Sequence, residues 1–194
     1  MTLPTPQDLH TFLRSRRSIR QFDSRPLPAE VITRLLQTAE CAPSAHNTRP
    51  WRFREIPLGA ARQTLTQTLL AAMQTDLTEA QQPPETIAAR AARTRRRIDD
   101  APLILLLCMD ENALPPQPTA HLAALEQHMG IQSTALAGLQ LLLAAHAENL
   151  AAVWICWPLY APRALQTALN LPAAWQPQAL FFIGYPCPNP NPKP

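Results

Sequence analysis

Glycine is unusually rare in this sequence, which contains four glycines in 194 residues, whereas glycine makes up about 7% of an average protein. The sequence also lacks the strings G-x-G-x-x-G and G-x-x-x-x-G-K-[ST]. Such glycine-rich loops bring the backbone close to phosphate in the common dinucleotide-binding and nucleoside-triphosphate-binding folds. Their absence argues against both folds, so any phosphate site here must use side chains or helix ends.

Cysteine and histidine are also few, and their spacing forms no metal or redox motif. The four cysteines include no C-x-x-C pair, and the five histidines include no H-E-x-x-H pair. His121 and His128 share an expected helix face, but no nearby Cys or carboxylate completes a ligand set. Cys108 and Cys156 lie inside apolar runs. We therefore expect no metal site, and buried free thiols of the kind found in reducing compartments.

The sequence shows no apolar segment suited to secretion or membrane insertion. The first six residues have no charged start followed by an apolar run. The most apolar helical stretch, Leu136 to Leu150, is too short to span a bilayer and is interrupted by polar residues. The net charge of +3 suits an anionic ligand without demanding nucleic acid. We expect a soluble, cytoplasmic protein.

Length and composition fit one folded domain. A chain of 194 residues with 46% hydrophobic residues can bury a full core, and no repeat or linker divides it. Prolines alternate along the C-terminal end, which favours an extended arm. We expect one domain over residues 1–186 and a Pro-rich tail over residues 187–194.

Apolar periodicity predicts six helices and four strands. The expected helices are Pro6 to Arg14, Pro28 to the residues before Pro43, Gly59 to Leu77, Glu85 to Asp99, His121 to Leu150, and Pro162 to Leu169. The expected strands are Trp51 to Ile56, Leu103 to Met109, Ala152 to Trp157, and Ala179 to Tyr185. These elements predict an α+β layered fold. The fifth helix would measure about 45 Å, so it must cross the centre of the fold or join a partner subunit.

The first polar cluster is Arg16-Arg17-Ser18-Ile19-Arg20-Gln21-Phe22, directly after the first expected helix. Guanidinium groups and a hydroxyl can surround a phosphate with charge-assisted hydrogen bonds. Taken alone, the cluster is more typical of a basic helix end, where arginine offsets the helix dipole, than of a phosphate site.

The second polar cluster runs from Ala42 to Trp51 and leads into a strand. Asn47 and Arg49 have side chains that can hydrogen-bond a polar heterocycle, and Ser44 can approach a ring edge. Taken alone, this segment is more typical of an ordinary loop between two prolines.

Together, the two clusters resemble the nitroreductase family of enzymes that depend on flavin mononucleotide (FMN). In this resemblance, R-R-S-x-R-x-F precedes A-P-S-x-x-N-x-[QR]-P-W by about 25 residues. Four later segments agree in the same order, namely Arg97 to Pro102, Ala152 to Trp157, Leu171-Pro172, and Gly184 to Pro186. The resemblance spans Leu13 to Pro186.

This resemblance implies a nitroreductase-like α+β fold with a central, mainly antiparallel sheet surrounded by helices. It also implies an intertwined homodimer with a long central helix and FMN at the interface. Arg16, Arg17 and Ser18 would hold the FMN phosphate, and Arg20 would reach the pyrimidine edge of the ring. The other subunit would supply Pro43, Ser44, Ala45 and Asn47, and Arg49 is a further expected cofactor-binding residue. Arg97 and the segment Ile155, Cys156 and Trp157 would lie beside the flavin, and Lys193 is the only basic residue in the tail.

The resemblance further implies that the flavin, and no protein side chain, carries the chemistry. NADH or NADPH would deliver a hydride to flavin N5, and a nitro compound, a quinone or a related small acceptor would remove it. Arg20 and Arg97 would stabilise negative charge on the reduced ring.

Three other interpretations stay open. Four segments resemble the C-terminal flavin domain of the coenzyme F420 biosynthesis enzyme FbiB. They are Thr48-Arg49-Pro50, Ala72-Met73 with Asp76-Leu77, the arginine run from Arg93 to Arg97, and Leu171 to Pro177. A flavin-binding domain without turnover would result if Trp157 or the tail closed the site. A basic nucleic-acid-binding module using Arg16 to Arg20 and Arg93 to Arg97 is the remaining alternative.

Overall fold

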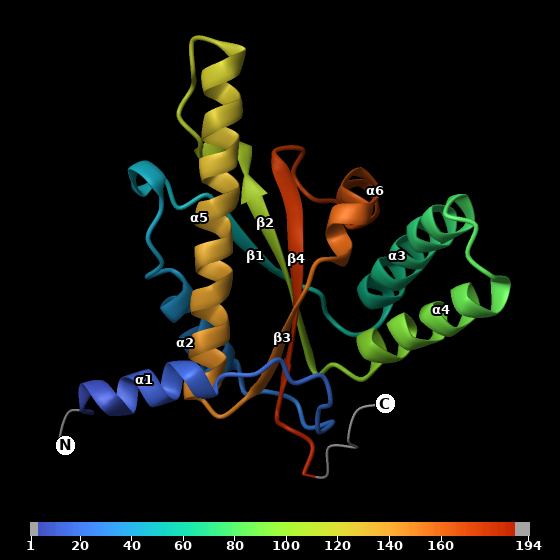
Figure 1. Ribbon diagram of the computed structural model, residues 1–194, viewed down its shortest axis with the longest axis horizontal. Coiled ribbons are helices and arrows are strands. Elements are labelled where there is room, and N and C mark those ends of the chain that lie inside the picture. Colours follow the sequence, from blue (N-terminus) through green and yellow to red (C-terminus); the bar gives the residue numbers. More distant parts are fainter. Residues whose placement is uncertain (1–3, 189–194) are drawn as a thin grey trace.

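A four-stranded antiparallel sheet forms the centre of the fold (Figure 1). The computed structural model describes residues 4–188 of the chain. Its strands are β1 (Trp51–Glu55), β2 (Leu103–Asp110), β3 (Ala151–Ile155) and β4 (Trp175–Gly184). They lie in the order β1-β2-β4-β3, and each neighbouring pair is antiparallel. The predicted α+β class with a mainly antiparallel sheet is confirmed.

Helices cover both faces of this sheet, with α2 and α5 on one face and α3, α4 and α6 on the other (Figure 1). The α-helices are α1 (Pro6–Ser15), α2 (Ala29–Ala39), α3 (Ala60–Glu79), α4 (Pro84–Asp99), α5 (Ala120–Ala147) and α6 (Pro162–Ala168). Short 3-10 helices are η1 (Ala45–Asn47), η2 (Glu111–Ala113) and η3 (Trp157–Tyr160). Across residues 4–188, no helix combines the length and the apolar character that a membrane crossing requires.

Strand β2 is apolar along nearly its whole length because both of its faces are covered. Successive side chains of a strand point to opposite faces of the sheet. Leu105 and Leu107 pack in the cluster that contains α2 and α5, whereas Ile104 and Leu106 pack in the cluster that contains α3, α4 and α6. This double burial explains the continuous apolar run that the sequence shows in place of alternation.

Helix α5 ends at Ala147, three residues before the predicted end at Leu150. Asn149 adopts a left-handed conformation with φ of 56°. The backbone N–H of Leu150 then donates to the Ala145 carbonyl at 2.9 Å. This is the usual helix-terminating arrangement, in which a left-handed residue just past the helix lets the following N–H reach back. The asparagine fills a position that is more often glycine.

Strand β3 ends at Ile155, so the predicted strand from Ala152 to Trp157 is too long by two residues. Cys156 leaves the ladder and Trp157 begins η3. Pro158 follows inside η3. Proline has no N–H for a ladder and fixes φ at a value suited to a helical turn, which accounts for the early end.

Strand β4 begins at Trp175, four residues before the predicted start at Ala179, and passes through Pro177. Strand β3 pairs with β4 only as far as Leu180, so Pro177 has a neighbour on the β2 side alone. There it lies opposite Cys108, beside a register shift in β2. Proline is tolerated in a sheet at such an edge or irregularity.

Substitution of Gly138 in α5 tests the contact between this helix and the sheet. A Cβ at Gly138 would overlap the Trp154 ring and come within 2.9 Å of Phe181. We expect Gly138→Ala to lower the free energy of unfolding by about 2 kcal/mol, because overpacking outweighs the gain in helix propensity. Urea denaturation measures this change.

The matched control is Gly130→Ala in the same helix. There, an added Cβ meets only the ends of the flexible Leu114 and Met109 side chains. Unchanged or higher stability is expected for this variant. Equal stability losses in the two variants would contradict the packing argument.

Candidate functional site

The segment after α1 lies against the ends of two sheet strands. The backbone N–H of Ile19 donates to the Ala152 carbonyl at the start of β3, at 3.1 Å. The backbone N–H of Asp23 donates to the Tyr185 carbonyl just after β4, at 2.9 Å. These bonds hold the first polar cluster in an extended conformation beside the central sheet.

The arginines of the first cluster differ in what they contact. Arg17 donates from Nη1 to the carbonyls of Arg14, at 2.6 Å, and Arg16, at 2.9 Å, so in this chain alone it caps the end of α1. Arg20 donates to the Ser18 carbonyl at 3.3 Å. Within residues 4–188, neither Arg16 nor Arg20 forms an ion pair with a carboxylate. Arg16, a predicted phosphate contact, and Arg20, a predicted flavin contact, are therefore cations without a paired carboxylate.

Arg97 lies close enough to Arg20 for the two positive charges to interact. Its pKa is lowered from the usual arginine value, first by desolvation and then by the positive charges of Arg20 and Arg93. Repulsion between these guanidinium groups means that a local anion would be stabilised there. The structure thus brings together Arg20 from the N-terminal segment and Arg97 from α4.

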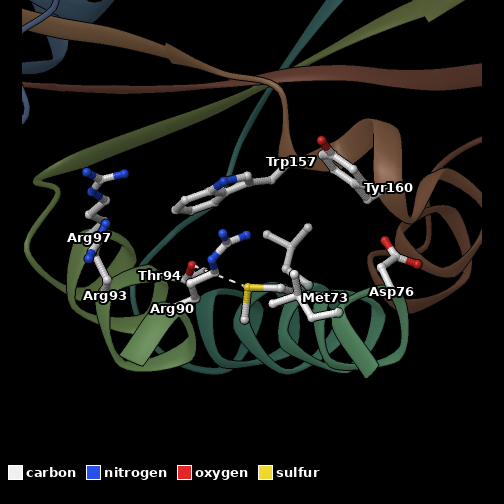
Figure 2. A pocket seen from close by; sticks show the side chains of 10 residues that line it. Met73, Asp76, Arg90, Arg93, Thr94, Arg97, Trp157 and Tyr160 are labelled. Carbon is white, nitrogen blue, oxygen red and sulfur yellow. Dashed lines mark hydrogen bonds between the residues drawn. The ribbon is translucent and has the colours of Figure 1, made fainter. Parts of the chain in front are cut away.

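A cavity of about 400 Å³ opens beside Arg97, between α3, α4 and η3 (Figure 2). Trp157 forms part of its wall and is held there by an edge-to-face contact with Phe182, at 5.9 Å between ring centroids. The ten lining residues are Leu69, Met73, Asp76, Leu77, Arg90, Arg93, Thr94, Arg97, Trp157 and Tyr160.

The segment before Trp157 is positioned by the end of β3. Ile155 is buried in the core on the α3 and α6 side. Cys156 is exposed and accepts a hydrogen bond from Trp154 Nε1 at 3.0 Å. The expectation of buried thiols is wrong for Cys156 and for Cys41, which is also exposed, and it is correct for Cys108. Cys156 is exposed because β3 ends one residue before it.

The second polar cluster forms a compact loop around η1. His46, Asn47 and Arg49 have φ values of 52°, 53° and 45°. Ser44 Oγ accepts from the backbone N–H of Arg49 at 3.0 Å, and Asn47 Oδ1 accepts from Arg49 Nε at 3.3 Å. Left-handed backbone at consecutive non-glycine residues is costly and is most common where function requires it.

This loop is anchored on the first half of α5. The backbone N–H of Ala45 donates to Ser133 Oγ at 3.1 Å, and His46 Nε2 lies 3.5 Å from the buried Glu126 carboxylate. Glu126 was not singled out by the sequence analysis. A glutamate in an apolar helix, near a histidine in the fold but far from it in sequence, gives no local signal.

The two polar clusters lie toward opposite ends of α5 in one chain (Figure 1). The end of α1 is fixed to the end of α5, because Ser15 Oγ lies 2.9 Å from His146 Nε2. Ser133, which holds the loop, is thirteen residues earlier and therefore about 20 Å away along the helix axis. A single chain does not bring Pro43, Ser44, Ala45 and Asn47 to the arginines of the first cluster.

Several residues around the cavity were missed as site residues by the sequence analysis, and one predicted residue cannot be placed. Tyr160 lines the cavity without belonging to any recognised motif, whereas Met73 and Asp76 belong to the segments that resemble the FbiB flavin domain but were not expected as site residues. Arg90 was missed although it precedes Arg93 and Arg97 by three and seven residues, a spacing that places all three on one helix face. Lys193 lies outside the described residues.

The chain belongs to the nitroreductase family, whose model matches residues 13–185. It is 31% identical over 171 residues to 5,6-dimethylbenzimidazole synthase of Rhodospirillum rubrum, a match that covers 88% of this chain and 78% of that protein. It is 28% identical to a protein of Methanothermobacter thermautotrophicus provisionally named NADH dehydrogenase/NAD(P)H nitroreductase, with 95% of this chain and 80% of that protein covered.

Solved structures share the fold over nearly the whole chain. A provisionally named nitroreductase of Desulfovibrio desulfuricans, crystallised in complex with FMN, superposes with a TM-score of 0.71 and 25% identity. That match covers 99% of this chain and 92% of the other. The nitroreductase-like fold expected from the sequence is therefore confirmed.

Thiol reactivity tests the local structure at the end of β3. Burial raises the pKa of Cys108 to about 12, so at pH 8 it is a neutral thiol without solvent access. We expect iodoacetamide at pH 8 to alkylate Cys156 and Cys41 in the folded protein and to leave Cys108 unmodified, because the thiolate is the nucleophile. Peptide mass spectrometry measures each site.

Unfolding in urea provides the control for this experiment, because it should make Cys108 as reactive as the other two thiols. Equal labelling of Cys108 and Cys156 in the folded protein would contradict the structure.

Proposed function

We propose that this protein binds FMN and acts as an oxidoreductase that takes a hydride from NADH or NADPH and passes it to a nitro compound, a quinone or a related small acceptor. The observation that carries the proposal is a group of cations beside the sheet: Arg97 lines the cavity together with Trp157, and the positive charge of Arg20 is near enough to lower the pKa of Arg97. Within residues 4–188, neither arginine forms an ion pair with a carboxylate. Membership in the nitroreductase family and the FMN complex of the Desulfovibrio relative support this choice of cofactor.

The chemistry of the available donors fits FMN. Its phosphate requires cations or N–H donors, and Arg16 and Ser18 offer these without a glycine-rich loop. Its pyrimidine edge carries carbonyl acceptors, which match the guanidinium groups of Arg20 and Arg97. Arg17 would add to the phosphate site by exchanging its contacts with the α1 carbonyls. Lys193 in the tail is proposed as a further cation near the phosphate.

FMN, when bound, supplies hydride transfer, whereas the protein supplies binding, orientation and electrostatics. Arg20 and Arg97 would favour negative charge on the adjacent ring, since their own repulsion is relieved by it. The Trp157 ring and Ile155 would form an apolar surface that limits water beside the ring. No side chain is required as a general acid or base in this proposal.

The proposal requires a homodimer, because each chain presents the two polar clusters at separate ends of α5. Five large apolar side chains of α5 are exposed in the single chain, namely Leu122, Leu125, Ile131, Leu136 and Leu139. Exposed apolar stripes of this kind mark interaction surfaces. Antiparallel packing of α5 against its copy would bring the partner's η1 loop toward Arg16 and Arg20.

A second candidate is the activity named for the Rhodospirillum relative, synthesis of 5,6-dimethylbenzimidazole. The identity of 31% over most of both chains favours it. Mass spectrometry for 5,6-dimethylbenzimidazole in an aerobic mixture of the protein, FMN and NADPH tests this candidate. The F420-related activity remains a prediction, and dehydro precursors of that coenzyme belong in the same acceptor screen.

The visible spectrum tests the cofactor directly. We expect the purified protein to be yellow, to release FMN on denaturation and to be bleached by anaerobic NADH or NADPH. The double variant Arg16→Ala/Ser18→Ala should weaken FMN binding by about 100-fold, because it removes a charged and a neutral phosphate contact. FMN titration followed by fluorescence measures the affinity.

Arg14→Ala is the matched control for the double variant, because Arg14 is exposed and also lies at the end of α1. Its affinity for FMN should equal that of the unmodified protein. A double variant with unchanged affinity would show that the phosphate is held elsewhere. A yellow protein that neither nucleotide bleaches would exclude NAD(P)H as the donor.

The dimer has its own test in α5. Leu136→Glu/Leu139→Glu places two charges on the exposed apolar stripe, and we expect a monomer that binds FMN at least about tenfold more weakly, because burying an unpaired charge costs several kcal/mol. Analytical ultracentrifugation measures the mass of the particle.

Leu58→Glu is the control for the dimer test, since Leu58 is exposed but lies outside α5, before α3. It should remain dimeric. An unmodified protein that sediments as a monomer with full FMN affinity would overturn the shared site.

A further inference from the structure

One wall of the cavity beside η3 carries three cations on a single helix face. Arg90, Arg93 and Arg97 project from α4 toward the cavity (Figure 2). Within the described residues none of them forms an ion pair, and Asp76 is the only carboxylate among the lining residues. The lining therefore has a net positive charge that the chain itself leaves uncompensated.

This arrangement differs from a solvated basic helix face. Arg95 and Arg96 are exposed and do not line the cavity, whereas Arg90 and Arg93 line it at its exposed rim and Arg97 lines it in a half-buried position. Desolvating a guanidinium group among other cations is unfavourable unless an anion compensates it. The position of Arg97 therefore favours an anionic occupant of the cavity.

Apart from Asp76 and Thr94, the remaining walls are apolar and aromatic. The rings of Trp157 and Tyr160 lie across the cavity from Met73 (Figure 2). Leu69 and Leu77, which belong to α3 as Met73 does, also line the cavity. Aromatic rings and a thioether make favourable contacts with a flat aromatic molecule. A volume of about 400 Å³ lies within the range of small-molecule sites.

We infer that this cavity binds the acceptor, and that the acceptor is an aromatic molecule carrying a carboxylate or phosphate group. The ring lies against Trp157 and Tyr160, and the anionic group is bound by Arg93 with Arg90 and Arg97. This inference rests on the proposed function, because Arg97 and Trp157 also belong to the proposed flavin site. It adds a substrate class that the family alone does not specify.

Calorimetric titration of the whole purified protein tests the inference with two matched probes. 4-Nitrobenzoate carries the anionic group, and 4-nitrobenzyl alcohol is its neutral counterpart. We expect the benzoate to bind at least about tenfold more tightly, a difference of about 1.4 kcal/mol. The preference should shrink as salt is raised, because part of it is electrostatic.

Variants on the two sides of α4 locate the binding group. Arg93→Gln should weaken 4-nitrobenzoate binding about tenfold and leave 4-nitrobenzyl alcohol unchanged, since one charged hydrogen bond is lost. Arg96→Gln removes the same charge from the same helix outside the cavity and should change neither affinity. Equal effects of the two substitutions, or equal affinities for the two probes, would overturn the inference.

The same samples separate this inference from the proposed function. Absorbance of bound flavin reports FMN independently of the probes. A yellow protein without preference for the anionic probe overturns the inference alone, whereas a colourless protein with that preference overturns the FMN proposal alone. If Arg93→Gln raises only the KM for NADPH relative to NADH, the arginines bind the nucleotide phosphate, and the assignment to the acceptor is wrong.

Discussion

The length of α5 is the constraint on which the rest of the site depends. The helix has 28 residues and so measures about 42 Å. Its final turns hold the end of α1 through His146, and its first half holds the η1 loop through Ser133 and Glu126. A rigid helix cannot bend enough to bring these anchors together. In the proposed function, a second copy of the chain would therefore complete the site, and the exposed apolar residues of α5 offer a surface for it.

The scarcity of glycine shapes the scaffold around this helix. Three helices end at left-handed residues that are not glycine, namely Asn149 after α5, Asn170 after α6 and Gln81 after α3. In each case the next residue donates its N–H back to a carbonyl five positions earlier. Asparagine tolerates this backbone conformation better than most residues. The same scarcity excludes a glycine-rich phosphate loop, so the proposed anion site uses arginine side chains instead.

The sequence predicts the order and type of the regular elements because burial on both sheet faces leaves strong apolar patterns. Element ends are less predictable, since Asn149 and Pro158 act through local backbone geometry, whereas Pro177 is tolerated only because β3 stops at Leu180. The family resemblance implies that Arg20 and Arg97 both lie beside the flavin, but it does not predict the cavity, whose lining comes from three separate elements. No local pattern ties Tyr160 to Arg93, because the two residues line one cavity only after α3, α4 and η3 have packed.

Two desolvated arginines, Arg62 and Arg97, differ in what compensates their positive charge. Arg62 is buried near the start of α3, and desolvation lowers its pKa, yet it donates to the carbonyls of Ile98, Ala101 and Ile56. Those bonds tie α3 to the end of α4 and to the residue after β1. The negative charges of Asp99 and Glu55 offset the desolvation of Arg62 within the chain, although its Nε has no hydrogen-bond partner. Arg97 is also desolvated but has other guanidinium groups as its charged neighbours. Folding stability alone gives no reason to gather cations in this way, whereas binding of an anion does, because the ligand then supplies the missing compensation.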